Sequence, residues 1–253
     1  GDWQGYLYIS QEYAEYTFFN FNYRENNIGI FLLNKLFVYL KLDHFGLNIF
    51  SALIFTLSIY IFLKKEKNFW LAICILIPII IIVLVIGYIK QGIAFSFFLI
   101  ALDYWKKNKN YKFLLFFLLG MLFHKSLIIF IFLFFINTKG KIKLNLIHIL
   151  VILIIFFSII YLNIYDKFLY YIDQSNVYFY SSGATIRLFI NLLPAITFVI
   201  FFKFYYKLNE FRLILIFSIL TFGLLFFVRD YSTIVDRYVM YLSILQLMVF
   251  LRI

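Results

Sequence analysis

Long apolar runs, with short clusters of lysines between some of them, constrain this chain more than any other feature of its sequence. Residues 45–63 and 69–87 contain no charged side chain. A hydrocarbon core about 30 Å thick needs roughly 20 apolar residues per helix, and these runs supply that length. Hydrophobic residues make up 65% of the chain and charged residues 14%, against about 25% charged in soluble domains. The composition excludes a water-soluble globular fold and predicts an all-α, polytopic integral membrane protein.

We expect roughly eight to ten helices that span or partly enter the bilayer, in a single transmembrane domain over residues 1–253. Residues 28–42 are apolar but short and are interrupted by Asn34 and Lys35, which favours an interfacial or half-inserted helix. The expected full spans are 45–63, 69–87, 89–105, 145–164, 188–205, 212–228 and 238–251. Because the chain opens with Gly1 rather than Met, we expect a helix to be missing in front of it.

The net charge of +11 comes largely from lysine clusters that lie between the apolar runs. These clusters are 64–67, 106–109 and 139–143. They are typical of cytoplasmic loops under the positive-inside rule, and their distribution argues against nucleic-acid binding. With the clusters inside, an outer loop 1–27, an outer loop 165–187 and residues 229–237 face the exterior together. The abundance of residues with AT-rich codons indicates a bacterial source, hence the inner membrane.

Segment 113–136 decides the topology. As one span, it would place the cluster 139–143 outside and invert every later loop. Two short arms that enter and leave on the cytoplasmic side preserve the charge rule, and Gly120 followed by the sequence around His124 offers a break. Broken helices are tolerated at membrane depth only where they line a polar cavity. We favour a broken or re-entrant pair near His124 over a single span.

Two polar groups precede this break. Asp2 is flanked by the rings of Trp3 and Tyr6, an arrangement that suits either sugar binding or an interfacial aromatic belt. Lys90 and Gln91 open the run 89–105, where a cation either snorkels to the head groups or contacts an anionic lipid head inside a cavity.

A third group of polar residues lies at the break, and a fourth lies in the outer loop 165–187. An imidazole such as that of His124 is the natural general base near neutral pH, although a lone histidine in an apolar run is usually a satisfied core residue. In the loop, Tyr178 and Tyr180 offer flat surfaces for a sugar, and Arg187 opens the next helix. An ordinary interfacial loop is the alternative.

The fifth group contains two Asp–Arg neighbours near the C-terminus. Arg237 and Tyr241 share a helix face at i, i+4. Arg229 and Arg237, together with Arg187, form a set of guanidiniums that is able to converge on a pyrophosphate, because a planar fork matches phosphate oxygens. Mutual neutralisation of adjacent groups, as in Asp236 beside Arg237, is the competing explanation.

Several motifs are absent from the sequence. It contains no GxxxxGK[ST], no GxGxxG and no HExxH. Three scattered histidines and one cysteine make no plausible zinc site. We therefore expect no cofactor and no metal, and the lack of a nucleotide-binding domain argues against ATP-driven transport.

The order of these groups resembles the bacterial polysaccharide repeat-unit polymerases of the Wzy/EpsG type. Members show a Gly-x-Asp motif in an outer loop, an Arg-Gln at the head of a mid-chain helix, a basic loop, a Phe-His-x-Ser and a late Asp-Arg-x-x-x-Tyr. The corresponding segments here are Gly1-Asp2-Trp3, Lys90-Gln91, the basic loop 106–112, Phe123-His124-Lys125-Ser126, and Asp236-Arg237 with Tyr241. Lysine stands in place of the family's arginine at position 90, and the family's first and last helices are expected to lie outside this chain.

The resemblance implies a membrane glycosyltransferase of polysaccharide biosynthesis, making O-antigen, capsule or exopolysaccharide. It would polymerise repeat units linked to undecaprenyl diphosphate on the outer face of the inner membrane. The catalytic candidates are His124, Asp2 and Asp236. The pyrophosphate-binding candidates are Arg187, Arg229, Arg237 and Lys90. The sugar-binding candidates are Trp3, Tyr6, Gln91, Tyr178, Tyr180 and Tyr241. The partners expected are the lipid-linked oligosaccharides and the bilayer, with a chain-length regulator and a flippase as further candidates.

Three other classes remain open. A lipid-linked oligosaccharide flippase or transporter would need a wide alternating-access cavity and usually twelve or more helices. A membrane O-acyltransferase would need its histidine within reach of a cytosolic acyl donor. A purely structural scaffold is a third possibility, and the number of ionisable residues within the membrane counts against it.

Overall fold

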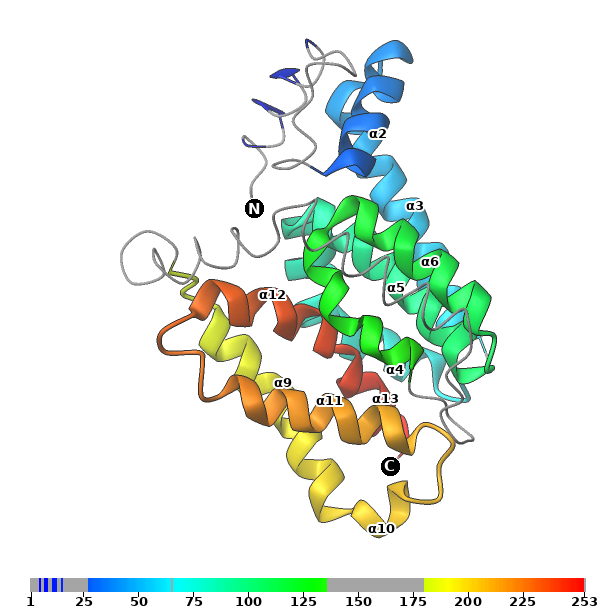
Figure 1. Cartoon of the computed structure of the whole chain (residues 1–253), viewed down its shortest axis with the longest axis vertical. Coiled ribbons are helices and arrows are strands. Elements are labelled where there is room, and N and C mark those ends of the chain that lie inside the picture. Colours follow the sequence, from blue (N-terminus) through cyan, green and yellow to red (C-terminus); the bar gives the residue numbers. More distant parts are fainter. Residues whose placement is uncertain are drawn as a thin grey trace. The chain divides into compact units, whose positions relative to one another are not determined.

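The computed structural model describes residues 27–64, 66–135 and 180–252, together with Gly5, Leu7, Tyr8, Gln11, Glu12 and Glu15. Every regular element in this part of the chain is a helix (Figure 1), which confirms the all-α prediction. The chain forms two compact units. The first unit comprises Gly1–Lys64 and Ile81–Ile164, and the second comprises Lys65–Ile80 and Tyr165–Ile253.

The first unit contains the helices α2 (Ile28–Tyr39), α3 (Asp43–Leu63), α5 (Ile89–Lys106) and α6 (Asn110–Phe123), followed by the 3₁₀-helix η2 (Lys125–Phe134). The second unit contains α4 (Phe69–Leu76), α9 (Ala184–Ile200), α10 (Phe202–Tyr205), α11 (Phe211–Leu224), α12 (Ser232–Leu242) and α13 (Ile244–Phe250). The π-helix η1 (Ile77–Gly87) continues α4 and begins one residue before Pro78. Because proline lacks an N–H and clashes with the preceding turn, it disfavours a regular α-helical ladder there.

Two helical segments in the described residues are long and apolar enough to cross a membrane, Asp43–Leu63 and Phe69–Gly87. A third candidate is the pair α12 and α13, which passes the same test when it is taken as one span bent by 40°. The helix expected over 28–42 is present as α2. The segment expected as the span 89–105 forms the helix α5, which does not pass this test. The expected span 145–164 lies outside the described residues.

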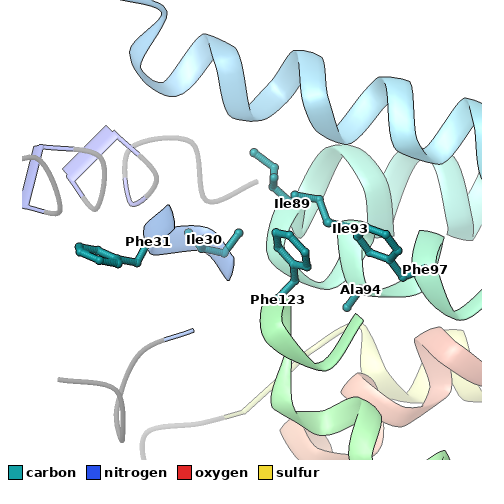
Figure 2. Close-up of a cluster of buried hydrophobic side chains, with 7 residues drawn as sticks. All are labelled: Ile30, Phe31, Ile89, Ile93, Ala94, Phe97 and Phe123. Atoms are coloured by element: carbon teal, nitrogen blue, oxygen red, sulfur yellow. The ribbon is translucent and has the colours of Figure 1, made fainter. Parts of the chain in front are cut away.

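Helix α5 is the centre of the first unit and packs against α3 and α6. Its first turns contribute Ile89 and Ile93 to a buried cluster that also contains Phe123, from the end of α6. Figure 2 shows Phe123 beside the side chains that α5 presents, and its ring stacks on that of Phe97 with centroids 5.5 Å apart. The end of α6 therefore lies against the beginning of α5.

The chain breaks at His124, as predicted. His124 is extended, with φ −151° and ψ 114°, between α6 and η2. The rings of Phe113, in the first turn of α6, and Phe134, at the end of η2, have centroids 6.4 Å apart. A straight helix would hold these residues roughly 30 Å apart, so η2 folds back along α6. The two arms are therefore a hairpin rather than one span.

Both open ends of this hairpin lie at the C-terminal end of α5. The indole Nε1 of Trp105 donates a 2.7 Å hydrogen bond to the carbonyl oxygen of Leu133, near the end of η2. Asn108, with φ 55°, makes the tight turn into α6, a conformation that asparagine tolerates better than most residues. Lysines of the predicted cytoplasmic set lie at this end: Lys64, Lys106, Lys107, Lys109 and Lys112. The break lies at the opposite end.

In the second unit, α9 runs parallel to the bent pair α12–α13, with α11 beside them in the opposite direction (Figure 1). At one end Arg187 of α9 pairs with Asp236 of α12. At the other, the hydroxyl of Tyr205 donates a 3.0 Å hydrogen bond to the carbonyl oxygen of Val249 in α13. Cations gather at the second end, after α9 and around the start of α11: Lys203, Lys207, Arg212 and Arg252.

Two boundaries differ from those expected. The helix expected over 188–205 begins earlier, at Ala184, and α9 ends at Ile200 before a separate short helix α10. The helix expected over 238–251 begins at Ser232 and is interrupted at Ser243. The Ser243 hydroxyl donates a 2.9 Å bond to the carbonyl oxygen of Val239, and such back-bonding bends helices.

Candidate functional site

An ion pair between α9 and α12 is the centre of the candidate site in the second unit. Arg187 Nε donates to Asp236 Oδ1 at 2.6 Å, and Arg187 NH2 donates to Asp236 Oδ2 at 2.7 Å. The two side chains retain only 14% and 9% of their exposure. A bidentate pair of this kind holds one edge of the guanidinium in a defined position. Two sequence candidates, 49 residues apart, are thus brought together.

Two serines complete this ion pair. Ser181 Oγ donates to Asp236 Oδ2 at 2.8 Å and accepts from Arg187 NH2 at 3.1 Å. The backbone N–H of Ser181 donates in turn to Ser232 Oγ at 3.0 Å. We refer to these four residues as the Arg187 cluster. Ser181 was noted in the sequence only as a hydroxyl of the outer loop 165–187, and Ser232 was not noted. Hydroxyl residues are common at helix starts, and only the fold brings these two together.

Gly183 supports the cluster from the backbone side. A Cβ placed on this residue would lie 2.3 Å from Arg187 NH1 and 2.7 Å from both Cζ and NH2. The guanidinium therefore rests directly on the glycine, immediately before the first turn of α9. Only a residue without a side chain leaves room for it.

Neutralisation of Asp236 by its neighbour Arg237 was the competing explanation, and the structure places Asp236 in an ion pair with Arg187. Adjacent residues on a helix point in different directions and do not face each other. Arg237 is half-buried and Arg229 is exposed, on the segment that leads into α12. Convergence of the three guanidiniums stays a prediction.

The sugar-binding candidates of this unit lie in different environments. Tyr180 is 70% exposed beside the Arg187 cluster, whereas Tyr241 is fully buried within α12. Tyr178 lies outside the described residues, as do Asp2, Trp3 and Tyr6 of the N-terminal loop. Their roles therefore stay predictions.

The first unit brings together its own two candidate motifs. Phe123, next to His124, belongs to the same buried cluster as Ile89 and Ile93, which flank Lys90 and Gln91. The helix break and the first turn of α5 thus share one end of the unit, away from the lysines at the end of α5. Nδ1 of His124 and Oγ of Ser126 share a hydrogen bond of 2.5 Å. This contact holds the ring in one orientation.

A network of buried amide side chains lies one helical turn after Arg187 along α9, and it was not predicted. Asn191 Nδ2 donates to the Val239 carbonyl at 2.9 Å and to Ser243 Oγ at 3.2 Å. Gln246 Nε2 donates to Asn191 Oδ1 at 2.6 Å. All three polar side chains are almost completely buried. Asn191 follows Arg187 by four residues and therefore shares its face of α9, a spacing that was available in the sequence.

A charge cluster closes the opposite end of the second unit. Arg252 NH1 is paired with Glu66, and Arg252 NH2 lies 2.9 Å from Glu66 Oε1 and 3.2 Å from Glu210 Oε2. The hydrogen bonding of Arg252 to the carboxylate of Glu66 is the largest of the causes that raise the pKa of Arg252. Among the described residues, no three His, Cys, Asp or Glu side chains come together as a metal site would require.

Comparison with known proteins gives one match. A search of curated proteins and a search of solved structures each found nothing similar. The family model described as the EpsG family matches residues 1–253, which is the whole chain. The chain therefore belongs to the EpsG family.

Proposed function

We propose that this protein polymerises lipid-linked oligosaccharide repeat units on the outer face of the bacterial inner membrane. Membership of the EpsG family fits a polysaccharide polymerase-type role. The observation that carries the finer proposal is the Arg187 cluster, a fixed guanidinium at the end of the second unit opposite its lysines. Under the positive-inside rule that end faces the exterior.

The reaction is an inverting glycosyl transfer. The bond between the anomeric carbon of the growing glycan and a diphosphate oxygen breaks, and the undecaprenyl diphosphate leaves with the bonding electron pair. A hydroxyl oxygen of the acceptor repeat unit forms the new glycosidic bond, and its proton passes to a base. Negative charge grows on the leaving group, so preorganised cations aimed at it supply the largest share of the rate. We assign this role to Arg187, with Arg229, Arg237 and Lys90 as further candidates.

His124 is our candidate for the base. Its Nδ1 shares a hydrogen bond with Ser126, so Nε2 is the nitrogen that we assign to proton transfer. Asp2 is the alternative base.

We assign sugar recognition to aromatic and amide side chains. The candidates are Trp3, Tyr6, Gln91, Tyr178, Tyr180 and Tyr241. Partners with which the reaction would be coordinated are a flippase that delivers repeat units and a chain-length regulator.

Deletion of the gene, followed by electrophoresis of the surface glycan, tests the function. We expect the polymer ladder to disappear while a single capped repeat unit remains. Repeat units trapped inside the cell would indicate a flippase instead, and an unchanged ladder would contradict both.

His124→Ala in a purified assay with a lipid-linked repeat unit tests the base. We expect polymer formation to fall by at least about 100-fold, since general base catalysis contributes about 10²–10⁴-fold. His44→Ala, another histidine substitution in the first unit, is the matched control. A wild-type rate for His124→Ala would remove this residue from the mechanism.

A further inference from the structure

The Arg187 cluster contains more groups than an ion pair requires, and the additional serine has a direct role in its geometry. We propose that Ser181 is a positioning residue, which together with Asp236 fixes the guanidinium of Arg187 so that NH1 is presented to the diphosphate. This inference rests on the proposed function and names the device that orients its principal cation.

The donor count of Arg187 supports the assignment. A guanidinium carries five N–H donors in a rigid fork. Asp236 takes one from Nε and one from NH2, and Ser181 takes the second N–H of NH2. In the described part of the chain, NH1 donates no hydrogen bond. Both of its N–H groups therefore stay available for phosphate oxygens.

The hydrogen bonds that Asp236 accepts also support its role in fixing Arg187. Oδ1 accepts from Arg187 Nε, and Oδ2 accepts from Arg187 NH2 and from the hydroxyl of Ser181. A carboxylate held by three donors is oriented toward them rather than toward an incoming hydroxyl. The geometry therefore makes Asp236 a holder of Arg187 and not the base that accepts the proton of the acceptor.

Ser181 links the two charged groups because its hydroxyl accepts from one and donates to the other. Its own place is set from α12, where Ser232 Oγ accepts its backbone N–H at 3.0 Å. Without the Ser181 hydroxyl, the guanidinium keeps its edge on Asp236 but loses the contact that stops it rotating about that edge. NH1 would then sample several directions.

The test compares Ser181→Ala with Ser181→Thr, which keeps the hydroxyl, and with Ser182→Ala, which removes the hydroxyl of the exposed neighbour. Each variant of the full chain is assayed in nanodiscs for kcat and KM, and for inhibition by inorganic pyrophosphate. We expect Ser181→Ala to lower kcat and weaken pyrophosphate inhibition, each by about tenfold, because misplacement of an orienting group lowers the rate. Ser181→Thr and Ser182→Ala should stay near wild type.

A double-mutant cycle with Arg187→Lys shows whether Ser181 acts through Arg187. A lysine ammonium has no planar fork to orient, so Ser181→Ala should cause no further loss in the Arg187→Lys background. If Ser181→Ala fails to fold, Ser232→Ala replaces it, because this change leaves the Ser181 hydroxyl in place but removes its anchor. A smaller loss in the same direction is then expected.

Three results would overturn the inference. Ser181→Ala could have the same kcat and pyrophosphate inhibition as Ser182→Ala, or Ser232→Ala could match the wild type where it is the variant that folds. The third is that Ser181→Ala lowers kcat equally with and without Arg187→Lys. Failure of the proposed function is a different result. In that case the wild-type protein itself would form no polymer from the lipid-linked repeat unit.

Discussion

Gly183→Ala should disable the candidate site while leaving the fold in place. Gly183 has φ −87° and ψ −8°, an ordinary right-handed conformation that alanine adopts without strain. The added methyl group meets only the flexible end of Arg187, where the closest atom, NH1, would lie 2.3 Å away. Ordinary contacts of this kind begin at 3.4 Å. The guanidinium must therefore move by about 1.1 Å (3.4 − 2.3).

A displacement of this size breaks the ion pair without unfolding the protein. A shift of about 1.1 Å along the hydrogen bonds from Arg187 to Asp236, which measure 2.6 and 2.7 Å, lengthens them to about 3.7 and 3.8 Å. These distances are beyond a hydrogen bond. Misplacement of a positioned group by 1 Å can lower the rate about 100-fold, which corresponds to about 2.7 kcal/mol. For the fold, replacing glycine with alanine gains about 0.4–1 kcal/mol through the unfolded chain. This gain offsets part of the lost pairing.

The assay is polymer formation from a lipid-linked repeat unit in nanodiscs, with thermal unfolding measured on the same samples. Gly223→Ala in α11 is the matched control, because a Cβ there meets nothing within 4 Å. We expect the control to keep full activity and Gly183→Ala to lose about 100-fold at a nearly unchanged melting temperature. Wild-type activity of Gly183→Ala would refute the role of the guanidinium, and a large drop in melting temperature would refute the claim that the site alone is affected.

Three further substitutions test the packing. Asn191→Leu leaves the buried amide of Gln246 without its acceptor, so we expect a loss of about 1–3 kcal/mol in unfolding free energy, measured by thermal unfolding in nanodiscs. Arg252→Gln removes the charged partner of Glu66 and one partner of Glu210, and a loss on the order of 2 kcal/mol should follow in the same assay. Gly120→Val should cost about 1–3 kcal/mol by overpacking, because a Cβ there would lie 2.7 Å from a methyl carbon of Leu127; Gly223→Val is its control.

The sequence predicted well those elements that depend on features of neighbouring residues. The break at His124 was predictable because charge distribution and the glycine at 120 both pointed to one short segment. The break at Ser243 was not predicted, since a serine within an apolar run is common and only its bond to the Val239 carbonyl reveals the bend. Local chemistry thus located one break and missed the other.

The site required contacts between distant residues. Arg187 and Asp236 were both predicted as site residues, but in different roles and not as partners of each other. The true pairing joins positions 49 residues apart, and no periodicity or spacing in one sequence carries that information. The same holds for Ser181, whose role depends on the parallel arrangement of α9 and α12.

The central claim is that the helix break and the Arg187 cluster each lie at the end of their own unit opposite its lysines, so that under the positive-inside rule each faces the outside of the membrane. Single cysteines at 126, 182 and 207, introduced after Cys74→Ala, test this with a membrane-impermeant maleimide applied to intact cells. We predict that Ser126→Cys and Ser182→Cys react from outside, whereas Lys207→Cys reacts only after permeabilisation. Labelling of Ser126→Cys and Ser182→Cys from opposite sides of the membrane would contradict the account.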